Sequence, residues 1–317
     1  MKLFIQIPCY NEEDNLLKTL NDLPLKIDGI DEIEILIIDD GSTDNTLQIA
    51  KNSKAHHVLS LGSNRGLATA FRKGVDFALS HGADILVNTD ADNQYCANDI
   101  SKLVSPILSS EADLVVGCRP IIDHPEFKFS KKILQIIGSW TLRKISRTTA
   151  RDAASGFRAF NRESLQRIFI HSRFSYCMET LIQAGNSGIR VFSVDINVNP
   201  KTRESRLFKN TYEYIIKSTS TIISMFILYR PGRFFSFIAL PFILISLFLG
   251  FRFLYLIYFI QSFDSGRTHI PSLILLSVCI IIGTLLIALG IVGEIQKAQR
   301  KITEESLYLQ KKMLEDK

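Results

Sequence analysis

The sequence lacks the marks of several protein classes. Its five cysteines are scattered without a C-x-x-C pair, so we expect neither a disulfide framework nor a zinc site, and a reducing compartment fits them. Lys and Arg number 37 against 32 Asp and Glu, an excess too small to indicate a nucleic-acid-binding stripe. There is no Walker loop and no Gly-x-Ser-x-Gly elbow, and the six histidines show no spacing typical of a metal site or a triad.

The composition is that of a folded protein with an uneven distribution of apolar residues. Hydrophobic residues make up 46% of the 317 positions and charged residues 22%, which excludes a disordered chain. The length suffices for one large domain or two modest ones. We find no internal repeat and no low-complexity stretch, so the apolar excess must come from particular segments.

Two such segments lie near the C-terminus, at about 234–260 and 270–293. A bilayer core needs roughly 20 apolar residues in a helix, and both segments exceed that length. Arg252 is the one charged residue of the first segment and lies among aromatic residues, as an interfacial anchor does. The alternative is a pair of buried helices in a soluble core, but core helices of this length keep a polar face. The sequence therefore predicts two transmembrane helices.

Basic residues lie at the two outer ends of this pair of apolar segments. Arg230 and Arg233 precede it, and Lys297, Arg300 and Lys301 follow it. By the positive-inside rule, both ends are cytosolic and the pair is a hairpin. We expect a cytosolic domain over 1–205, a membrane-interface segment over 206–232 and a cytosolic helix over 296–317. The interface segment mixes basic and aromatic residues at helical spacing, and an ordinary helix of the soluble domain is the alternative.

The first 100 residues alternate between strand and helix patterns. Short apolar runs that predict strands occupy residues 2–7, 32–39, 58–62 and 83–92, and helical patterns occupy 11–23, 44–53 and 66–82. This order predicts an α/β domain with a mostly parallel, doubly wound sheet. Ligands of such sheets bind at the carboxyl ends of the strands.

Chemically distinctive residues follow three of these strands. The first strand ends in the segment PCYNEE, the second in Asp39 and Asp40 before a Gly-Ser turn, and the fourth in Asp90 and Asp92. An Asp-x-Asp pair at a strand end is a weak signal alone, since it can cap a helix or face solvent. With the other two motifs, it indicates a shared site in which a divalent cation binds both carboxylates. Oxygen ligands favour Mg²⁺ or Mn²⁺ over zinc.

Together the motifs resemble those of the family 2 glycosyltransferases. They are PCYNEE, IDDGSTD, NRGLATA, DADNQ and DAASGFR, and within the family they look most like the polyprenyl-phosphate glycosyltransferases. The resemblance covers about the first 210 residues, and the two-span tail is similar to the bactoprenol branch. It implies a GT-A fold, a Rossmann-like sheet domain that uses a sugar nucleotide and a divalent metal.

The resemblance also implies roles for individual residues. Asp39 reads the nucleotide base, with Asp40 the second choice, and Asp90, Asp92 and Gln94 hold Mg²⁺ or Mn²⁺. The implied nucleotide-sugar site consists of Pro8, Tyr10, Glu12, Asp39, Asp40, Asn64, Arg65, Gly66, Asp90, Ala91, Arg203 and Arg206. Arg206 stands at a position where a lysine is usual in the family. Arg203 and Arg206 have an alternative role in binding anionic lipid headgroups.

The segment RDAASGFR is similar to the acceptor loop of that family. Arg119, Arg151, Ser155 and Arg158 are the candidates that bind the acceptor phosphate, and arginine suits a phosphate by geometry and charge. Asp152 is the candidate base. A lipid phosphate is largely dianionic at neutral pH, so Asp152 can instead orient groups. The catalytic candidates are Asp92, Arg119, Asp152 and Arg158.

These inferences define an enzyme. We expect an inverting transferase that moves a hexose, glucose by resemblance, from a UDP-sugar to undecaprenyl phosphate at the cytosolic face of a bacterial plasma membrane. The alternatives are transfer from GDP-mannose, as in a dolichyl-phosphate mannose synthase, and a non-catalytic scaffold that binds sugar nucleotides. We expect a multi-pass membrane protein that forms a homo-oligomer, with a tetramer as one option, and no nucleic-acid partner.

Overall fold

The computed structural model describes residues 1–120, 138–144, 146–170, 176–200, 216, 219–220, 223–224, 226–260 and 270–315. The chain divides into two compact units. The first, which we call the sheet unit, comprises Met1–Ser218 together with Glu304–Lys317. The second, the helical unit, comprises Thr219–Thr303.

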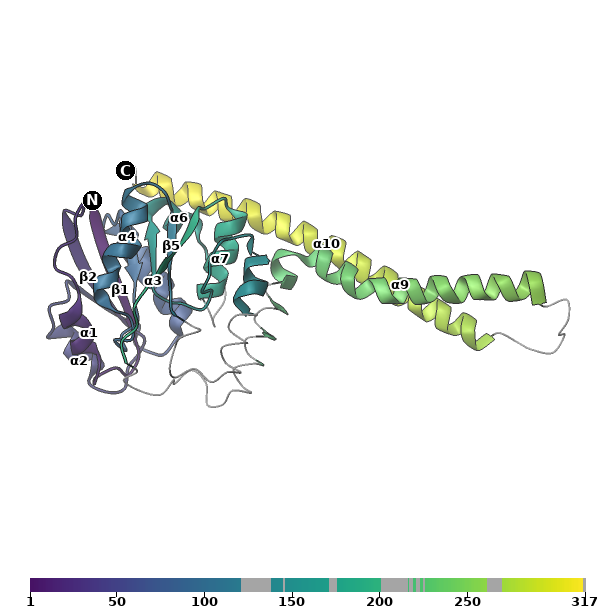
Figure 1. The fold of residues 1–317 in the computed structure, drawn as a ribbon, viewed down its shortest axis with the longest axis horizontal. Coiled ribbons are helices and arrows are strands. Elements are labelled where there is room, and N and C mark those ends of the chain that lie inside the picture. Colours follow the sequence, from purple (N-terminus) through teal and green to yellow (C-terminus); the bar gives the residue numbers. More distant parts are fainter. Residues whose placement is uncertain are drawn as a thin grey trace. The chain divides into compact units, whose positions relative to one another are not determined.

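The described strands of the sheet unit form one sheet of seven in the order β3-β2-β1-β4-β6-β5-β7. Strands β1 and β2 lie side by side in it (Figure 1). Their bounds are β1 Lys2–Cys9, β2 Glu32–Asp39, β3 His57–Ser60, β4 Ile85–Asn88, β5 Leu114–Cys118, β6 Arg158–Asn161 and β7 Val191–Asp195. All neighbours pair in parallel except β6, which is antiparallel to both β4 and β5. The prediction of a mostly parallel sheet is confirmed.

Helices cover both faces of the sheet. The side chains of β1 alternate between these two faces, so apolar groups on each face need a helix to cover them. Leu3, Ile5 and Ile7 are fully buried in the apolar core that includes residues of α1 and α4. Gln6 points to the other face, where its side chain bonds Phe71 of α3. The described helices of this unit are α1 Leu16–Asp22, α2 Thr46–Lys51, α3 Leu67–Ser80, η1 Ala97–Asp99, α4 Ile100–Leu108, α6 Arg162–Arg167 and α7 Tyr176–Asn186.

Close packing of α3 on the sheet depends on a glycine. A Cβ atom on Gly74 would lie 2.3 Å from Oε1 of Gln6 and 2.9 Å from Cδ1 of Ile38. Any larger residue would push the helix off β1 and β2. The short approach matters for function because the N-terminus of α3 follows the predicted Asn64–Gly66 segment of the site.

The outer edge of β7 is covered by the segment that leads into the predicted acceptor loop. Oγ1 of Thr149 donates to the carbonyl oxygen of Val191 at 2.7 Å, and the backbone N–H of Arg151 donates to Oγ of Ser193 at 3.2 Å. These bonds use polar groups that an open edge strand would leave unpaired. They also fix where residue 152 enters the site.

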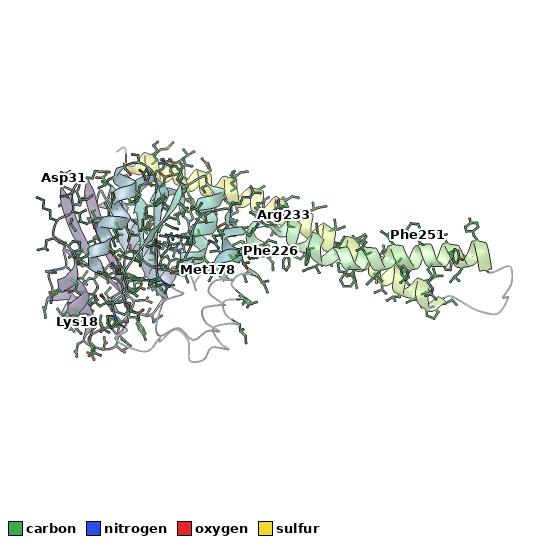
Figure 2. All side chains as sticks on the ribbon, viewed as in Figure 1. Lys18, Asp31, Met178, Phe226, Arg233 and Phe251 are labelled. Carbon is green, nitrogen blue, oxygen red and sulfur yellow. The ribbon has the colours of Figure 1, made fainter. Side chains whose placement is uncertain are left out.

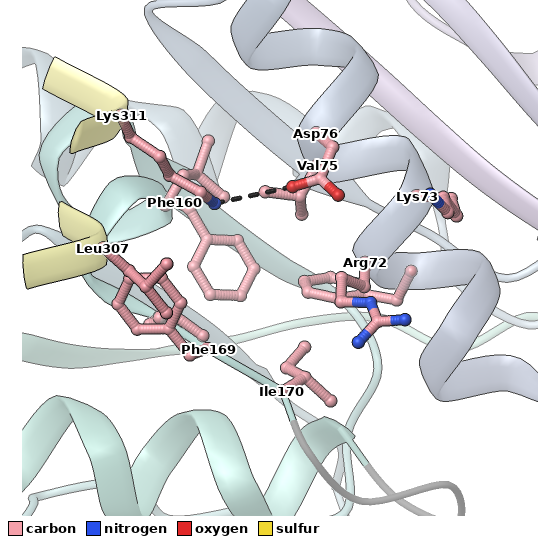
Figure 3. A pocket seen from close by; sticks show the side chains of 12 residues that line it. Arg72, Lys73, Val75, Asp76, Phe160, Phe169, Ile170, Leu307 and Lys311 are labelled. Carbon is pink, nitrogen blue, oxygen red and sulfur yellow. Dashed lines mark hydrogen bonds and ion pairs between the residues drawn. The ribbon is translucent and has the colours of Figure 1, made fainter. Parts of the chain in front are cut away.

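The last turns of α10 (Ile270–Glu315) belong to the sheet unit from Glu304 onward. The ring of Tyr308 lies under the guanidinium of Arg167 at 4.4 Å, and Nζ of Lys311 approaches Oδ1 of Asp76 at 3.4 Å. Beside these contacts lies a cavity of about 300 Å³ (Figure 3). Its lining residues come from α3, from the β6–α6 region and from α10: Phe71, Arg72, Lys73, Val75, Asp76, Phe160, Leu165, Ile168, Phe169, Ile170, Leu307 and Lys311.

The helical unit contains α9 (Pro231–Tyr255), the π-helical turn η2 (Leu256–Ile260) and the part of α10 before Glu304. By length and composition α9 and α10 are each able to cross a membrane. Their large apolar side chains face outward, as Phe251 does with 68% of its surface exposed (Figure 2). The described part of the helix predicted over 296–317, up to Glu315, is the continuation of α10.

Small residues bring α9 and α10 together at one end of the pair. The Cβ position of Gly290 is 3.5 Å from Cα of Gly232, and that of Gly293 is 2.5 Å from Cβ of Pro231. The backbone N–H of Gly232 donates to a carboxylate oxygen of Glu294 at 3.2 Å. Glycine at such contacts allows close helix approach where no hydrophobic effect drives association.

Candidate active site

The predicted nucleotide residues gather where the chain reverses direction across the sheet. After β1 the chain adds β2 and β3 on one side, and β4 then pairs with the other side of β1. In open α/β sheets the crevice beyond the carboxyl ends of the strands at this point is the ligand site. The PCYNEE segment, Asp39 and Asp40, and Asp90 and Asp92 all follow the strands that border it.

The loops after β1 and β2 are bonded to each other. The N–H of Asn11 donates to Oγ of Ser42 at 3.0 Å, and Oδ1 of Asn11 accepts from the N–H of Thr43 at 2.8 Å. A carboxylate oxygen of Glu13 accepts from the N–H of Asn45 at 3.0 Å. Asn11 has a φ of 56°, a left-handed conformation that asparagine tolerates better than most residues. The two loops therefore form one rigid wall of the crevice.

Asp39 and Asp40 hold further loops of that wall. Asp39 is 1% exposed, and its carboxylate accepts from the N–H of Ser42 and from Oγ of Ser60, each at 3.1 Å. The carboxylate of Asp40 accepts from the N–H groups of Arg65 and Gly66 at 2.8 and 2.9 Å. Burial raises the pKa of Asp40, although these two bonds oppose it. Both carboxylates shape the site before any ligand binds.

Gly41 is required where these loops meet. Its φ is +73°, and a Cβ atom there would lie 2.4 Å from the carbonyl carbon of Ser63. A side chain is excluded both by the left-handed backbone and by the neighbouring chain. The turn after β2 thus contacts the segment that leads to Asn64 and Arg65.

The other predicted nucleotide residues differ in exposure. Tyr10 is 39% exposed, and Asn64 and Arg65 are exposed as well, whereas Glu12 is 6% exposed. Pro8 and Ala91 are buried, and the carbonyl oxygen of Ala91 accepts from Oγ1 of Thr19 at 2.9 Å. Gly66 precedes α3 with a φ of +90°. The predicted residues Arg203 and Arg206 lie outside the described residues.

Asp90 and Asp92 follow β4 and are both half-buried. Oδ1 of Asp92 accepts from the N–H of Gln94 at 3.1 Å, and the carbonyl oxygen of Gln94 accepts from the N–H of Asn199 at 2.8 Å. Within the described ranges no three His, Cys, Asp or Glu side chains are placed to hold a metal by themselves. Mg²⁺ often binds through one or two carboxylates and completes its shell with substrate oxygens and water, so a magnesium site does not require a third carboxylate.

Asp152 and Arg119 form an ion pair on the other side of the crevice, in which Asp152 is fully buried and Arg119 is half-buried. Nε of Arg119 donates to Oδ2 of Asp152 at 2.7 Å, and Nη2 donates to Oδ1 at 3.0 Å. Burial of Asp152 opposes its ionisation, but the Arg119 guanidinium outweighs it and lowers the pKa of Asp152. A carboxylate held in this way remains ionised at neutral pH and is a weak base.

Arg158 and Ser155 are placed differently from the prediction. Arg158 is fully buried, and its guanidinium donates to the carbonyl oxygens of Ser155, Ala153 and Cys177 and to Oγ1 of Thr180. Ser155 is also fully buried. The expectation that these two side chains bind the acceptor phosphate is corrected, because a direct contact would require Arg158 to give up these bonds. Arg158 instead ties the loop after Asp152 to α7.

Arg151 lies at the surface. Its Nη2 pairs with Oδ1 of Asp195 at 2.9 Å, and the Asp195 side chain is 79% exposed. Such exposed pairs open at little cost, so Arg151 can still reach an anion. Among the predicted acceptor residues, Arg119 and Arg151 are the ones whose side chains reach the surface.

Two cysteines lie close to the site without the properties of nucleophiles. Cys9 ends β1 and Cys118 ends β5, and both are buried. Burial raises the pKa of each thiol. Neutral buried thiols are unreactive, so the chemistry of this site rests on oxygen and nitrogen groups.

The match to a known family decides what this arrangement belongs to. Residues 4–169, more than half of the chain, match Glycosyl transferase family 2. The chain belongs to glycosyl transferase family 2. The matched range of this family 2 enzyme contains all three strand-end motifs and the loop from Asp152 to Arg158. The predictions of the family and of an enzyme are confirmed.

Relatives and solved structures agree with this assignment. The chain is 30% identical to the UDP-N-acetylglucosamine–dolichyl-phosphate N-acetylglucosaminyltransferase of Methanococcus voltae, over 61% of this chain and 84% of the relative. It is 28% identical to the undecaprenyl-phosphate mannosyltransferase of Micrococcus luteus, over 65% and 88%. The fold is similar to that of glucosyl-3-phosphoglycerate synthase from Mycobacterium tuberculosis, with a TM-score of 0.56 and 20% identity over 71% and 78% of the two chains. The GT-A fold prediction is confirmed.

Sequence reasoning missed a group of residues behind Asp90. The structure brings Asn88, Tyr95 and Tyr176 around the backbone of Gly156. Gly156 belongs to the DAASGFR motif, so its presence near the site was predictable, but its contacts were not. Tyr176 lies at the start of α7, a helix for which the strand-end pattern carries no signal.

Proposed function

We propose that this family 2 enzyme transfers a hexose from a nucleotide sugar to a polyprenyl phosphate at a membrane surface. The observation that carries the proposal is that two pairs of charged side chains lie around one crevice. These are the Asp90 and Asp92 pair after β4 and the Arg119–Asp152 ion pair at the acceptor loop. Relatives named for transfer to dolichyl and undecaprenyl phosphates support the acceptor class.

The donor side supplies a rigid nucleotide pocket. The bonded loops after β1 and β2 preorganise Pro8, Tyr10, Glu12 and Asp39 for a nucleoside, which lowers the entropy cost of binding. Asn64, Arg65 and Gly66 extend that wall, with their backbone held by Asp40. Arg203 and Arg206 remain a prediction for closing over the nucleotide.

A divalent cation, Mg²⁺ or Mn²⁺, fits the donor side through Asp90, Asp92 and Gln94. The residues offer oxygen ligands only, which such cations prefer. When bound, the ion supplies charge that stabilises a nucleoside diphosphate as it leaves. Ala91, which lies between the two aspartates in the chain, is buried.

The acceptor side supplies charge rather than a base. A phosphate monoester, whose second pKa is about 6, is largely dianionic at neutral pH and can attack the anomeric carbon without losing a proton. Arg119 and Arg151 would offset its repulsion from the donor diphosphate. Because Asp152 is ionised and paired with Arg119, we assign it to orienting that guanidinium. Direct displacement would give a β-linked product from an α-linked donor.

The identity of the donor sugar is the most specific part of the proposal. We propose UDP-glucose, by resemblance to the bactoprenol branch, with GDP-mannose as the alternative. The named relatives act with N-acetylglucosamine and mannose, so the sugar is the feature in which members of this group differ. The preference of the enzyme between uridine and guanosine nucleotides tests the base-reading role of Asp39.

The membrane-crossing role of α9 and α10 completes the proposal. Both helices are long and apolar enough to span a bilayer, and Arg230 and Arg233 precede α9 while Lys297, Arg300 and Lys301 lie on α10 beyond its apolar stretch. The positive-inside rule then puts both ends in the cytosol. An anchored enzyme suits an acceptor whose tail stays in the bilayer. A homo-oligomer is a further expectation.

The proposal is tested by measuring product formation with purified full-length protein in detergent and Mn²⁺. Radiolabelled UDP-glucose, UDP-N-acetylglucosamine and GDP-mannose are each offered with undecaprenyl phosphate. We expect one donor to label the lipid at least tenfold faster than the others. Undecaprenol without phosphate is the matched control acceptor and should remain unlabelled. Labelling of neither acceptor by any donor would refute the proposed acceptor class.

A further inference from the structure

A buried polar cluster lies at the end of β4, two residues before Asp90. Nδ2 of Asn88, the last residue of β4, donates to the carbonyl oxygen of Gly156 at 3.0 Å and to the hydroxyl of Tyr176 at 2.8 Å. The Tyr176 hydroxyl in turn donates to the same Gly156 carbonyl at 3.2 Å. Asn88 and Tyr176 are both fully buried. Buried hydrogen bonds of this kind fix the positions of the groups they join, since breaking one leaves a buried polar group without a hydrogen-bond partner.

A second tyrosine holds the other end of the same peptide segment. The N–H of Gly156 donates to the hydroxyl of Tyr95 at 3.1 Å. The Tyr95 ring is 7% exposed and stacks on Phe157 with centroids 4.9 Å apart. Gly156 is therefore gripped at its N–H by Tyr95 and at its carbonyl by Asn88 and Tyr176. We call Asn88, Tyr95 and Tyr176 the glycine clamp.

The clamped glycine touches the predicted metal ligand. A Cβ atom built on Gly156 would lie 3.1 Å from Oδ1 and 3.4 Å from Oδ2 of Asp90, and 2.9 Å from the Tyr176 hydroxyl. Both carboxylate oxygens of Asp90 thus border the Cα of Gly156. The position of this backbone segment limits where the carboxylate can swing, and a residue with a side chain would displace it.

The clamp is itself supported from the sheet and from α3. Nε2 of Gln6 donates to Oδ1 of Asn88 at 3.0 Å and to the carbonyl oxygen of Phe71 at 3.3 Å. The Phe71 ring stacks on Tyr176 with centroids 4.2 Å apart and planes 11° apart. Phe71 also lines the cavity beside Leu307 and Lys311 (Figure 3). Each clamp side chain is thereby fixed in one orientation before ligands bind.

We propose that the glycine clamp positions Asp90 for cation and diphosphate binding, and that Tyr95 and Tyr176 are positioning residues of this reaction. The clamp also joins the donor side to the acceptor loop, because Gly156 lies four residues after Asp152 on the same loop. The inference rests on the proposed role of Asp90 in holding Mg²⁺ or Mn²⁺. It adds residues that touch neither substrate but set the geometry of one that does.

The direct test is the affinity for Mn²⁺ in the presence of UDP and, separately, GDP, measured by electron paramagnetic resonance on the full-length protein in detergent. Tyr176→Phe removes the hydroxyl and keeps the ring stacked on Phe71. We expect the dissociation constant for Mn²⁺ to rise about fivefold to tenfold, since one buried hydrogen bond is lost at a binding group. Binding of the nucleotide without metal should stay within twofold of the wild type.

A second variant and a control separate positioning from general stability. Tyr95→Phe removes the other hydroxyl of the clamp and should weaken Mn²⁺ binding to a similar degree. Tyr308→Phe is the matched control, because Tyr308 is a 9% exposed tyrosine of the same unit whose ring contacts Arg167. It should leave Mn²⁺ affinity unchanged. Thermal unfolding of all three variants shows whether the folded fraction is the same.

The outcomes distinguish the clamp from the proposed function. If the wild type binds Mn²⁺ and both clamp variants bind it within twofold of wild type, the clamp is refuted whatever the acceptor proves to be. Loss of thermal stability with unchanged Mn²⁺ affinity refutes it as well, since it indicates a purely structural role. Absence of Mn²⁺ binding by the wild type with either nucleotide refutes the cation site and the clamp together. If lipid labelling fails while Mn²⁺ binding is as expected, only the proposed function is refuted.

Discussion

The two sides of the crevice are built in different ways. On the donor side, the loops are bonded through residues of the sequence motifs themselves, since Asn11 bonds Ser42 and Asp40 bonds the backbone of Arg65. On the acceptor side, Asp152 and Gly156 are held by residues outside the motifs, namely Arg119, Asn88 and Tyr176. The donor side is thus built within its motifs, whereas the acceptor side depends on the packing of the whole sheet unit.

This difference predicts how each side fails. Changes on the donor side should affect ligand binding while the fold persists. Changes on the acceptor side should affect turnover and stability together, because the same bonds serve both.

Asp92→Ala should have the largest effect. It removes half of the carboxylate pair, and we expect transfer to fall about 10²- to 10³-fold, the usual loss for one electrostatic group at a reacting centre. The measurement is release of nucleoside diphosphate in the presence of polyprenyl phosphate. Asp28→Ala, at an exposed aspartate of the same unit, is the control. Unchanged release by Asp92→Ala would count against the mechanism.

Asp152→Asn should reduce turnover about 100-fold while the KM for the donor stays within threefold. The neutral amide leaves the buried side of Arg119 without its carboxylate, which we also expect to lower the free energy of unfolding by about 3 kcal/mol. Steady-state kinetics and denaturant unfolding check the two effects. A loss confined to donor affinity would contradict the placement of Asp152 on the acceptor side.

The same pair predicts a pH dependence. Because the pKa of Asp152 is lowered in the folded state, its stabilisation is complete above the unfolded-state pKa of about 4 and is lost as the pH falls through the lower folded-state value. Wild type should therefore lose more stability than Asp152→Asn between about pH 5 and pH 2. Transfer should decline below about pH 6 in both proteins, since the acceptor phosphate titrates there. An acid limb that disappears in Asp152→Asn would make Asp152 a general base after all.

Gly41→Ala probes the contacts between the donor-side loops. The left-handed backbone and the short approach to Ser63 should together lower the free energy of unfolding by about 2 kcal/mol. We expect weaker nucleotide binding, since the turn carries Asp39 and Asp40. Gly62→Ala is a useful comparison, because its φ is +71° but no atom lies near its Cβ position. Equal losses in the two variants would show that the contact with Ser63 is unimportant.

Lys311→Ala should have the smallest effect. Its ion pair with Asp76 is partly exposed on both sides, and such pairs contribute about 0.2–1 kcal/mol. Thermal unfolding should shift by a few degrees at most, and transfer should be unchanged. A large loss of transfer would indicate that the end of α10 contributes to the site.

Much of the donor side could be predicted because its signals are local. Apolar runs of strand length that end in carboxylates indicated β1, β2 and β4, and parallel pairing brings their carboxyl ends to one edge. The second half of the sheet carried no comparable pattern. The antiparallel insertion of β6 between β4 and β5 was not predicted, because pairing between distant strands depends on which buried faces fit.

Individual residues show the same division. Arg158 stood in a motif with phosphate-binding residue types, yet it is fully buried among carbonyl oxygens. A charged residue in a motif does not reveal which way its side chain points, and that direction decided its role. Tyr176 was invisible for the opposite reason, since it stands outside every motif and acquires its position only through α7 and Phe71.

The α/β alternation, the carboxylates at the strand ends, the two apolar helices and the family could all be inferred from the amino-acid sequence. These features follow from periodicity and from short motifs, which act within a few residues of one another. The folded chain was needed to learn that Arg119 neutralises Asp152, that Arg158 supports the loop and that Gly156 borders Asp90. These relations depend on burial, which forces each polar group to find a partner within the packed sheet unit.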